Sequence, residues 1–419
     1  MSERELDVVV LGATGVTGRR VAGYLMEQRP DGGWAAAGRD AARVEAVLAE
    51  EGVGAPETIV ADVADPQSLS ALASRARVVL NLVGPYTPTA RPVIEACVKS
   101  GAHYADLTGE IPFARRMVDE FHESAAAAGV KIVQVCGFES LPPDLCVLLA
   151  TEAARKRWDE RLSEADLELT GRPPGGLVRP SDLSGGTLQS LAAMVSDPEA
   201  ARARDPAALI ADEDAAARVR AASPISVAPR RGPGGAVIAP MQPSGFINPA
   251  VIQRTAALIA AESGEGFEPF RYREGLALTG SDASAPLRYA AAGAMAGPQA
   301  AFATATRAKP PLRGRIARAL TTLLPSSGFG PAAGRLEGWT WSMSVRARTA
   351  GGHEVRTRVD AEGQPGYLAT ARLLGEAGLL LSEVGTTPER AGCLTPATAI
   401  GTQSIERFER ARLRFSVGD

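Results

Sequence analysis

The sequence predicts an α/β protein with an N-terminal, doubly wound parallel sheet, followed by a second domain of α+β type. Over the first 150 residues, short continuous apolar runs alternate with segments of helical periodicity, as in parallel strands covered by helices on both faces. After Cys146 this alternation stops, and polar and apolar residues alternate as in antiparallel strands. A chain of 419 residues is also too long for one ordinary hydrophobic core, which favours two domains.

Each apolar run of the first 150 residues is expected to be a strand, and each periodic segment a helix. The expected strands are Leu6–Leu11, Trp34–Ala37, Thr58–Ala61, Val78–Val83, His103–Leu107 and Lys131–Val135. The expected helices are Val16–Glu27, Ala41–Glu50, Pro66–Ser74, Arg91–Ser100, Ala114–Ala128 and Leu145–Trp158. Because helices connect successive strands, the strands are expected to run parallel in one sheet.

The rest of the chain is expected to form an antiparallel or mixed sheet with further helices. The clearest signal is a hairpin of Trp339–Arg348 and His353–Val359, turning at residues 350–352. Further expectations are a strand at Glu164–Thr170, Gly- and Pro-rich sequence at 171–186, helical sequence at 200–222, irregular structure at 223–250 and a helix at Tyr367–Leu381. We divide the chain into domains 1–150 and 151–390 and a segment 391–419, expected to pack back on the first domain.

Composition narrows the classes of function. With 45% apolar and 22% charged residues the chain is a folded globular protein, and its formal net charge of -3 argues against a nucleic-acid partner. None of the four cysteines lies in a CxxC pair and only three histidines occur, so we expect reduced thiols and no metal site. The N-terminus lacks the basic and apolar regions of a signal peptide, which favours a cytoplasmic location.

The segment that comes closest to a transmembrane span is Ala285–Ala305. Arg288, Pro298 and Gln299 interrupt its apolar run, so we expect no span. A peripheral membrane contact of this segment stays open, and with it membrane association of the protein.

The strongest local signal is VVVLGATGVTGRRVAGYL, in which three glycines lie between an apolar strand and an amphipathic helix. Small residues at such a turn let the backbone approach a pyrophosphate, whose charge is stabilised by the N–H groups of the helix N-terminus. The sequence therefore predicts a Rossmann-type dinucleotide site lined by Gly12, Thr14, Gly15, Val16, Thr17 and Gly18. A plain strand–turn–helix is the alternative.

The ends of the next two strands bear on which dinucleotide is bound. An NAD site usually places Asp or Glu after the second strand, where this sequence has Gly38 and Arg39. A guanidinium suits the 2′-phosphate of NADP(H), although Arg39 could be an ordinary solvated arginine, and Asp40 could cap the next helix. Asp62 and Val63 follow the third strand and are expected to face the adenine; capping the following helix is an equal alternative for Asp62.

The fourth strand ends in NLVGPY, at the crevice where parallel sheets bind ligands. Val83, Gly84 and Pro85 are expected to form a turn beneath the nicotinamide ring of the dinucleotide. Tyr86 is expected beside that ring, or else packed as an ordinary loop aromatic.

The next two strands end in GAHYADLTGE and CGFESLPPD, which concentrate hydroxyl and carboxyl groups at adjacent strand ends. Such groups can act as a general acid near a hydride acceptor when their pKa is tuned. The catalytic candidates are Tyr86, Tyr104 and Asp106, with water as another proton source. His103 is expected to be a structural histidine of the core, and Glu139 could be only a turn residue.

Four segments carry a family resemblance: LGATGVTGRRVAGYL, LNLVGPY, ACVKSGAHYADLTGE and CGFESLPPD. Their kind and order resemble the saccharopine dehydrogenase-like family. PGYLATARLLGEAGLLL and AGCLTPATAIG resemble one branch of it, the trans-acting enoyl reductases of bacterial lipid and polyketide synthesis. The sequence departs from the family pattern at Glu139, where the family favours Asp, and in PYTPTARPV, which lacks the usual Tyr-Gly.

The resemblance implies an NADP(H)-dependent oxidoreductase whose second domain binds substrate and can also form a homodimer. In this branch, hydride would reach the β-carbon of an α,β-unsaturated acyl thioester on a carrier protein. An amino-acid dehydrogenase like saccharopine reductase is the second hypothesis, with Arg254, Arg271 and Arg273 as candidate carboxylate ligands. A non-catalytic, lipid-associated NADP-binding protein is the third.

Overall fold

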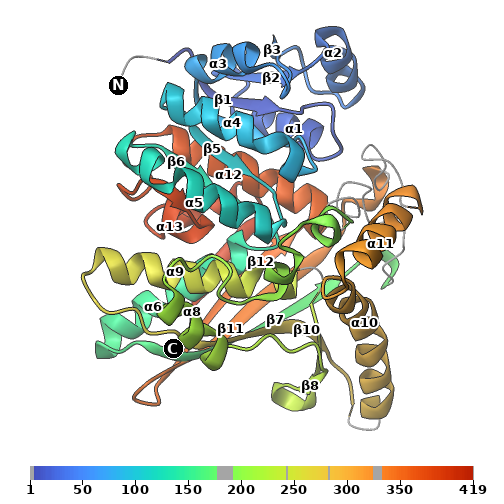
Figure 1. The fold of residues 1–419 in the computed structure, drawn as a ribbon, viewed down its shortest axis with the longest axis vertical. Helices are drawn as coiled ribbons and strands as arrows, with labels where there is room; N and C mark the ends of the chain where they lie inside the picture. Colours follow the sequence, from blue (N-terminus) through green and yellow to red (C-terminus); the bar gives the residue numbers. More distant parts are fainter. Residues whose placement is uncertain (1–3, 177–191, 242–243, 282–283, 324–332, 419) are drawn as a thin grey trace.

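Two sheets organise the part of the chain that the computed structural model describes, residues 4–176, 192–241, 244–281, 284–323 and 333–418. Figure 1 shows the parallel sheet in the upper half of the molecule and the second sheet in the lower half. The expected fold class, a doubly wound parallel sheet joined to a second domain with strands and helices, is confirmed.

The first sheet is wholly parallel, with the strand order β13-β6-β5-β4-β1-β2-β3. Its strands are β1 (Leu6–Leu11), β2 (Trp34–Gly38), β3 (Glu57–Val60), β4 (Ala76–Asn81), β5 (His103–Asp106), β6 (Lys131–Val133) and β13 (Gly392–Leu394). The strand order reverses between β1 and β4, so the carboxyl ends of these two strands border the crevice where such sheets bind ligands.

Helices cover both faces of this sheet. One face packs against α3 (Pro66–Arg75), α4 (Tyr86–Ser100) and α5 (Ile111–Ala127), and the other against α1 (Gly18–Gln28), α2 (Ala41–Glu50) and α12 (Thr370–Ser382). A buried polar contact fixes α12 beside α1, since the Tyr24 hydroxyl donates to the Glu376 carboxylate at 2.5 Å. Arg407 binds the other oxygen of Glu376 at 2.9 Å, which compensates its buried charge.

Several expected boundaries were wrong at the carboxyl ends of the strands. β4 ends at Asn81 rather than Val83, because the Asn81 side-chain oxygen accepts from the Val83 backbone N–H at 3.1 Å and turns the chain. α4 begins at Tyr86 rather than Arg91, because the Glu110 carboxylate binds the first N–H groups of the helix. Tyr86 is therefore the first residue of a helix, not a loop aromatic.

The second sheet is mixed, with the order β14-β12-β11-β7-β10-β9-β8 and only the β7–β10 pair parallel. Its strands are β7 (Leu162–Arg172), β8 (Arg230–Arg231), β9 (Val237–Ala239), β10 (Arg271–Leu278), β11 (Thr340–Thr349), β12 (Glu354–Glu362) and β14 (Leu413–Val417). The expected hairpin is confirmed as β11–β12, whose alternating buried and exposed residues place one face on the core.

The helices of this half are α6 (Leu141–Trp158), α8 (Glu213–Ala222), α9 (Asn248–Glu262), α10 (Ala285–Ala305), α11 (Pro310–Leu323) and α13 (Pro396–Ile400). α6 starts earlier than expected because prolines fit the first helical turn, where no N–H is needed. The expected helical sequence at 200–222 splits into a 3₁₀ turn and α8, and the supposedly irregular 223–250 contains β8 and β9. Of the expected Gly- and Pro-rich segment, 177–186 lies outside the described residues.

Among the residues that the structure describes, no helix is both long enough and apolar enough to cross a membrane. Ala285–Ala305 does form one continuous helix, α10, which lies at the side of the molecule in Figure 1.

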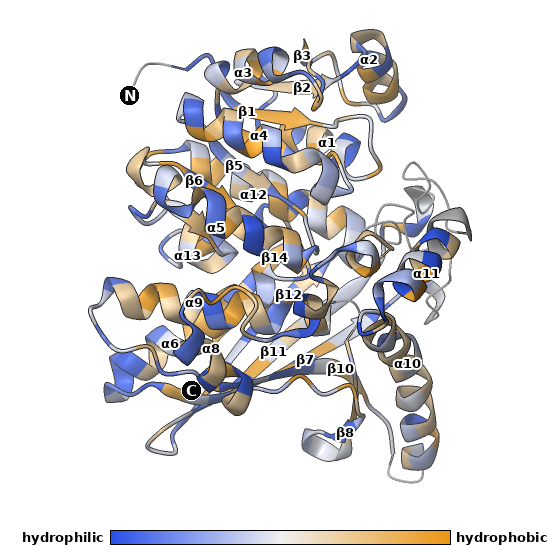
Figure 2. Ribbon diagram, viewed as in Figure 1, coloured by the Kyte–Doolittle hydropathy of each residue, from blue (hydrophilic) through white to orange (hydrophobic). Residues whose placement is uncertain are grey.

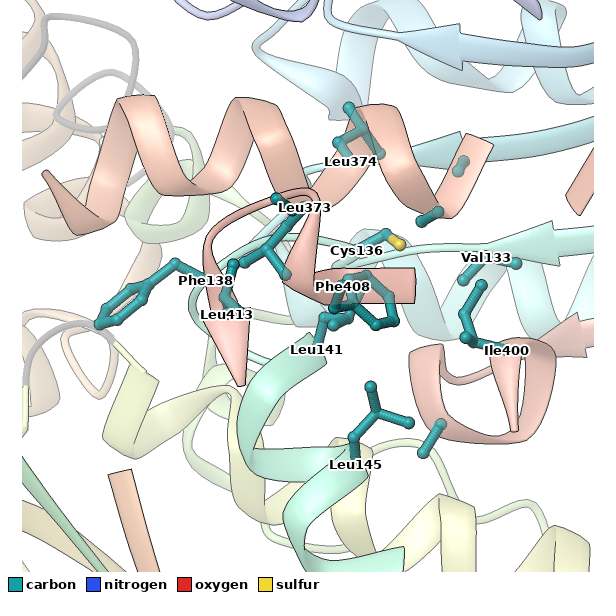
Figure 3. Packing of buried hydrophobic residues seen from close by; sticks show 14 of the residues in the cluster. Val133, Cys136, Phe138, Leu141, Leu145, Leu373, Leu374, Ile400, Phe408 and Leu413 are labelled. Atoms are coloured by element: carbon teal, nitrogen blue, oxygen red, sulfur yellow. The ribbon is translucent and has the colours of Figure 1, made fainter. Parts of the chain in front are cut away.

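One hydrophobic core joins the two sheets. Figure 2 colours β1 and parts of β11 as apolar, and both strands belong to the same cluster of buried side chains. Figure 3 shows the junction, where Phe138 and Leu141 meet Leu373 of α12 and Phe408 of the C-terminal segment. The proposed domain bounds stay a prediction. In the C-terminal part of the chain, α12 packs on the first sheet, β13 is a strand of that sheet, and β14 is a strand of the second.

Candidate functional site

The glycine loop forms a tight corner between β1 and α1. A Cβ on Gly18 would lie 2.2 Å from the Gly12 carbonyl oxygen, which no side chain can occupy. Gly12 itself has φ +90°, and a Cβ there would approach the Leu82 carbonyl carbon to 3.0 Å. The corner therefore lies directly against the end of β4, at the switch point of the sheet.

The N-terminus of α1 is suited to an anion. Thr17 makes no side-chain cap, and the first turn of the helix carries no acidic residue. Arg19 pairs with Glu51 at 2.9 Å, and the Arg20 guanidinium donates to the Val16 carbonyl oxygen, so both cations are held in place. The positive end of the helix dipole and the room left by the glycines fit a pyrophosphate.

The predicted phosphate residues differ in exposure. Thr14, Gly15 and Thr17 are half-buried, whereas Val16 is buried in a small cluster with Leu336 and Tyr367. Val16 thus fastens the loop to the C-terminal half of the chain through its side chain.

At the ends of β2 and β3, Arg39 is exposed, and Asp62 and Val63 are half-buried. The alternative for Asp40 is confirmed, because its carboxylate accepts from the Arg43 N–H and caps α2. The capping alternative for Asp62 was wrong: its carboxylate accepts from Ala64, within the turn, and Asp65 caps α3.

The turn after β4 contains Val83, Gly84 and Pro85, of which Gly84 is exposed and the other two half-buried. The Thr89 hydroxyl lies 2.7 Å from both the Val83 and the Pro85 carbonyl oxygens, and so holds the turn against α4. Val83 lies beside the glycine corner, since a Cβ on Gly12 would lie 3.0 Å from the Val83 Cγ2 atom. The place of this turn beneath the nicotinamide stays a prediction.

The structure brings the three catalytic candidates together in one buried network. The Tyr104 hydroxyl donates to Asp106 at 2.8 Å and accepts from the Asn81 amide at 3.0 Å. The Tyr86 hydroxyl accepts from the Leu107 N–H at 3.3 Å. Tyr104 and Asp106 are 0% exposed and Tyr86 is 7% exposed, so the network links the ends of β4 and β5 from inside.

Burial dominates the electrostatics of this network. It raises the pKa of Asp106 to about 7, even though the Thr108 and Val135 N–H groups donate to the carboxylate. Burial likewise raises the pKa of Tyr104 and Tyr86 well above the usual phenolic range. Both hydroxyls therefore stay protonated as hydrogen-bond donors.

His103 is a structural histidine. Its Nδ1 accepts from the Lys131 backbone N–H at 3.1 Å, between β5 and β6. Burial lowers its pKa to about 4, so the ring is neutral near pH 7.

The CGFESLPPD segment leads from the first sheet into the second half of the chain. The Ser140 hydroxyl donates to the Asn248 side-chain oxygen at 2.6 Å, and the Asn248 amide donates to Glu274 at 2.8 Å. Glu139, at the same strand end, is half-buried, and burial raises the pKa of its carboxyl. Asp144 is fully buried and binds Thr255 and the Ala397 N–H, so its role is to tie helices together.

A hollow that is partly open to solvent lies beside this chain of hydrogen bonds. Its walls include Met241, Pro249, Tyr272, Glu274 and Gln299. Ile247, which precedes α9, lies against the loop after β5, since a Cβ on Gly109 would lie 2.9 Å from the Ile247 Cδ1 atom.

Two of the three arginines considered for carboxylate binding are engaged elsewhere, and the third, Arg271, is exposed at the start of β10. Arg254 is buried and donates to the Leu209 and Cys393 carbonyl oxygens. Arg273 pairs with Asp166. Among the described residues, no group of three or more His, Cys, Asp or Glu side chains is placed to hold a metal ion.

Comparisons with known proteins decide the family. Residues 8–133 match the family described as Saccharopine dehydrogenase NADP binding domain. A Mycobacterium tuberculosis protein, named provisionally as a trans-acting enoyl reductase, is 35% identical over 97% of this chain and 96% of its own length. A protein named trans-acting enoyl reductase from Mycobacterium bovis is 32% identical over 98% of this chain and 97% of its own length. One of the same name from Mycobacterium ulcerans is 33% identical over 97% of this chain and 96% of its own length. The chain belongs to the trans-acting enoyl reductase family.

The fold agrees with this membership. Saccharopine dehydrogenase (L-Glu forming) from Saccharomyces cerevisiae superimposes with a TM-score of 0.51, covering 98% of this chain and 99% of that one at 14% identity. The matched domain makes this member of the trans-acting enoyl reductase family an NADP(H)-binding oxidoreductase. The resemblance carried by the four N-terminal motifs and the two C-terminal segments is confirmed.

Sequence reasoning missed Asn81, Asn248 and Glu274. A polar Asn81 at the end of an apolar strand is a local signal that could have predicted its place in the polar network. Asn248 and Glu274 lie more than 100 residues from Ser140, in a region with no recognisable pattern. The assignment of the cofactor and catalytic residues stays a prediction.

Replacing Gly18 by Ala tests the glycine corner. Its Cβ would collide with the Gly12 carbonyl oxygen, and the loop would have to open. We expect NADPH to bind about tenfold to a hundredfold more weakly, as when charged hydrogen bonds are lost. The control is Gly23→Ala in the same helix, whose Cβ would make an ordinary 3.6 Å contact with Val53. Titration of NADPH fluorescence measures both; equal affinities would refute the proposed corner.

Asp106→Asn tests the buried network through the pH dependence of stability. The folded carboxyl holds its proton up to a pKa of about 7, against an ordinary value of 3.8. The Asp106 carboxyl therefore makes its full contribution to the free energy of unfolding below about pH 4. This contribution falls by about 1.4 kcal/mol per pH unit and is lost as the pH rises through about 7. In Asp106→Asn we expect the pH dependence of the free energy of unfolding, measured with urea, to lose this part. The similar part from Asp144, whose pKa burial also raises to about 7, stays. Asp119→Asn, at an exposed position of α5, should keep both parts, and an unchanged pH dependence in Asp106→Asn would contradict the burial argument.

Proposed function

We propose that the protein uses NADPH to reduce the carbon–carbon double bond of an α,β-unsaturated acyl thioester presented on a carrier protein. The observation that carries this proposal is the identity of 32–35% along almost the whole chain to proteins named trans-acting enoyl reductase. The reaction would serve lipid or polyketide synthesis in the cytoplasm, with the protein acting in trans to the synthase.

The chain's own residues fit the parts of the cofactor in order along the sheet. The glycine corner and the α1 N-terminus would hold the pyrophosphate, and Arg39 the 2′-phosphate. Asp62 and Val63 would lie at the adenine, and Val83, Gly84 and Pro85 beneath the nicotinamide. When bound, NADPH supplies hydride from the nicotinamide C4.

The reaction also needs a proton at the α-carbon of the substrate. Since Tyr104 and Asp106 are fully buried and Tyr86 nearly so, we assign these three to positioning the ends of β4 and β5. The half-buried Glu139, whose carboxyl pKa is raised by burial, or a water molecule would then supply the proton.

The hollow beside Glu274 suits the acyl part of such a substrate. Its walls combine apolar side chains, among them Met241 and Pro249, with the polar Glu274 and Gln299. Apolar walls with few polar groups are typical of sites that orient a largely apolar ligand.

Reduction of enoyl thioesters tests the function directly. Purified protein is mixed with NADPH and enoyl thioesters of several chain lengths, and the loss of NADPH absorbance is followed. We expect turnover with at least one chain length and none with the corresponding saturated thioesters. NADPH oxidation only with an amino acid and a keto acid would favour the amino-acid dehydrogenase hypothesis instead. Tight NADPH binding without turnover on any substrate would favour the non-catalytic protein.

Arg39→Ala tests cofactor selection. Removing the guanidinium should weaken NADPH binding by about tenfold to a hundredfold, the usual cost of a lost charge-assisted hydrogen bond. Binding of NADH should be unchanged, because NADH lacks the 2′-phosphate. Arg43→Ala, at an exposed position of α2, is the matched control and should leave both affinities as they are. If Arg39→Ala weakens NADH and NADPH equally, the proposed role of Arg39 is wrong.

A further inference from the structure

The polarity of α10 is the reverse of that of an ordinary surface helix. Its 21 residues include a single charged residue, Arg288, and that residue is buried. The Arg288 guanidinium donates to three backbone carbonyl oxygens and so holds the helix on the second sheet. Ala292 and Gln299 are the other buried residues of the helix. The solvent-facing side of α10 is thus left without any charge.

That outer side is apolar. Leu287 is 73% exposed and Tyr289 43% exposed, and the other exposed positions are almost all Ala, Gly or Pro. A helix of this length extends about 30 Å. In Figure 1 it runs along one side of the molecule, and in Figure 2 its ribbon is largely apolar in colour.

Cations follow the apolar side directly. Between Ala285 and Leu323 the sequence has six Lys or Arg residues and no Asp or Glu, in a chain with a net charge of -3. Four of them have no carboxylate partner among the residues that the structure describes: Arg307, Lys309, Arg313 and Arg315. Leu312 lies among them and is 55% exposed.

We propose that the outer side of α10 together with α11, here called the α10–α11 face, binds peripherally to an anionic lipid membrane. Exposed apolar side chains beside a group of cations are the pattern of helices that lie in the membrane interface. The cations provide attraction to anionic headgroups, and Leu287, Tyr289 and Leu312 provide the apolar contact.

Charge and shape favour lipid over a protein partner at this face. A second copy of the chain would bring the same four cations together across a two-fold axis, which is repulsive. Protein interfaces usually gather their large apolar anchors in one central cluster. Here Leu287 and Leu312 lie in different helices, with small residues between them, so the apolar side chains are spread out rather than clustered.

The inner side of α10 connects this face with the proposed substrate site. Gln299 lines the hollow from the opposite side of the same helix. A membrane at the outer side would lie about one helix diameter, roughly 10 Å, from the hollow. The proposal does not depend on the proposed reaction, because the membrane contact is measured without substrate.

Vesicle flotation with the full-length protein tests the proposal. We expect binding to vesicles of phosphatidylcholine with phosphatidylglycerol, little binding to phosphatidylcholine alone, and a loss of binding in high salt. Arg313→Ala combined with Arg315→Ala should weaken binding about fivefold for each cation removed. Arg414→Ala, an exposed arginine of β14, is the matched control and should bind as the wild type does.

The apolar part is tested with Leu287→Glu, against Val384→Glu as a control at an 82% exposed position outside the face. Leu287→Glu should reduce vesicle binding, and Val384→Glu should not, while both variants bind NADPH normally, which shows that they fold. Equal binding to both kinds of vesicle, or equal effects of variant and control, would overturn the proposal. So would a wild-type dimer, detected by light scattering, that Leu287→Glu converts to a monomer, because the face would then join two copies. Capture of a purified acidic carrier protein in place of vesicles would overturn it as well.

Discussion

The contact between the glycine corner and the end of β4 constrains everything that would touch the cofactor. Gly12 can approach the Leu82 backbone, and Gly18 the Gly12 carbonyl oxygen, only because neither has a side chain. This approach brings the α1 N-terminus and the turn of Val83 and Pro85 to the same crevice. A dinucleotide that binds its phosphates at the first is then placed with its ring at the second.

The polar residues behind this crevice hold its walls rather than open into it. Asp106 and Tyr104 are fully buried, and the Glu110 carboxylate accepts hydrogen bonds from the first N–H groups of α4. The side chains that lead outward, Ser140 and Asn248, connect the sheet to the hollow near Glu274. The crevice and the hollow are thus joined by hydrogen bonds and by one continuous hydrophobic core.

The features that could be predicted from the sequence are those that depend on residues close together in the chain. Apolar runs located the parallel strands to within a few residues, and the glycine spacing located the corner. The start of α4 was missed because it depends on Glu110, 24 residues later in the chain. The place of α12 beside α1 rests on the contact of Tyr24 with Glu376, 352 residues apart, which no local pattern can reveal. The burial of Arg288 could not be predicted either, because in the sequence an arginine within an apolar segment only indicates that the segment does not span a membrane.

A calorimetric titration of the intact protein with NADPH and, separately, with NADH tests the central claim most directly. The account predicts one site per chain, with NADPH bound more tightly than NADH because Arg39 contacts the additional phosphate. Uptake of neither nucleotide, or tighter binding of NADH, would contradict it.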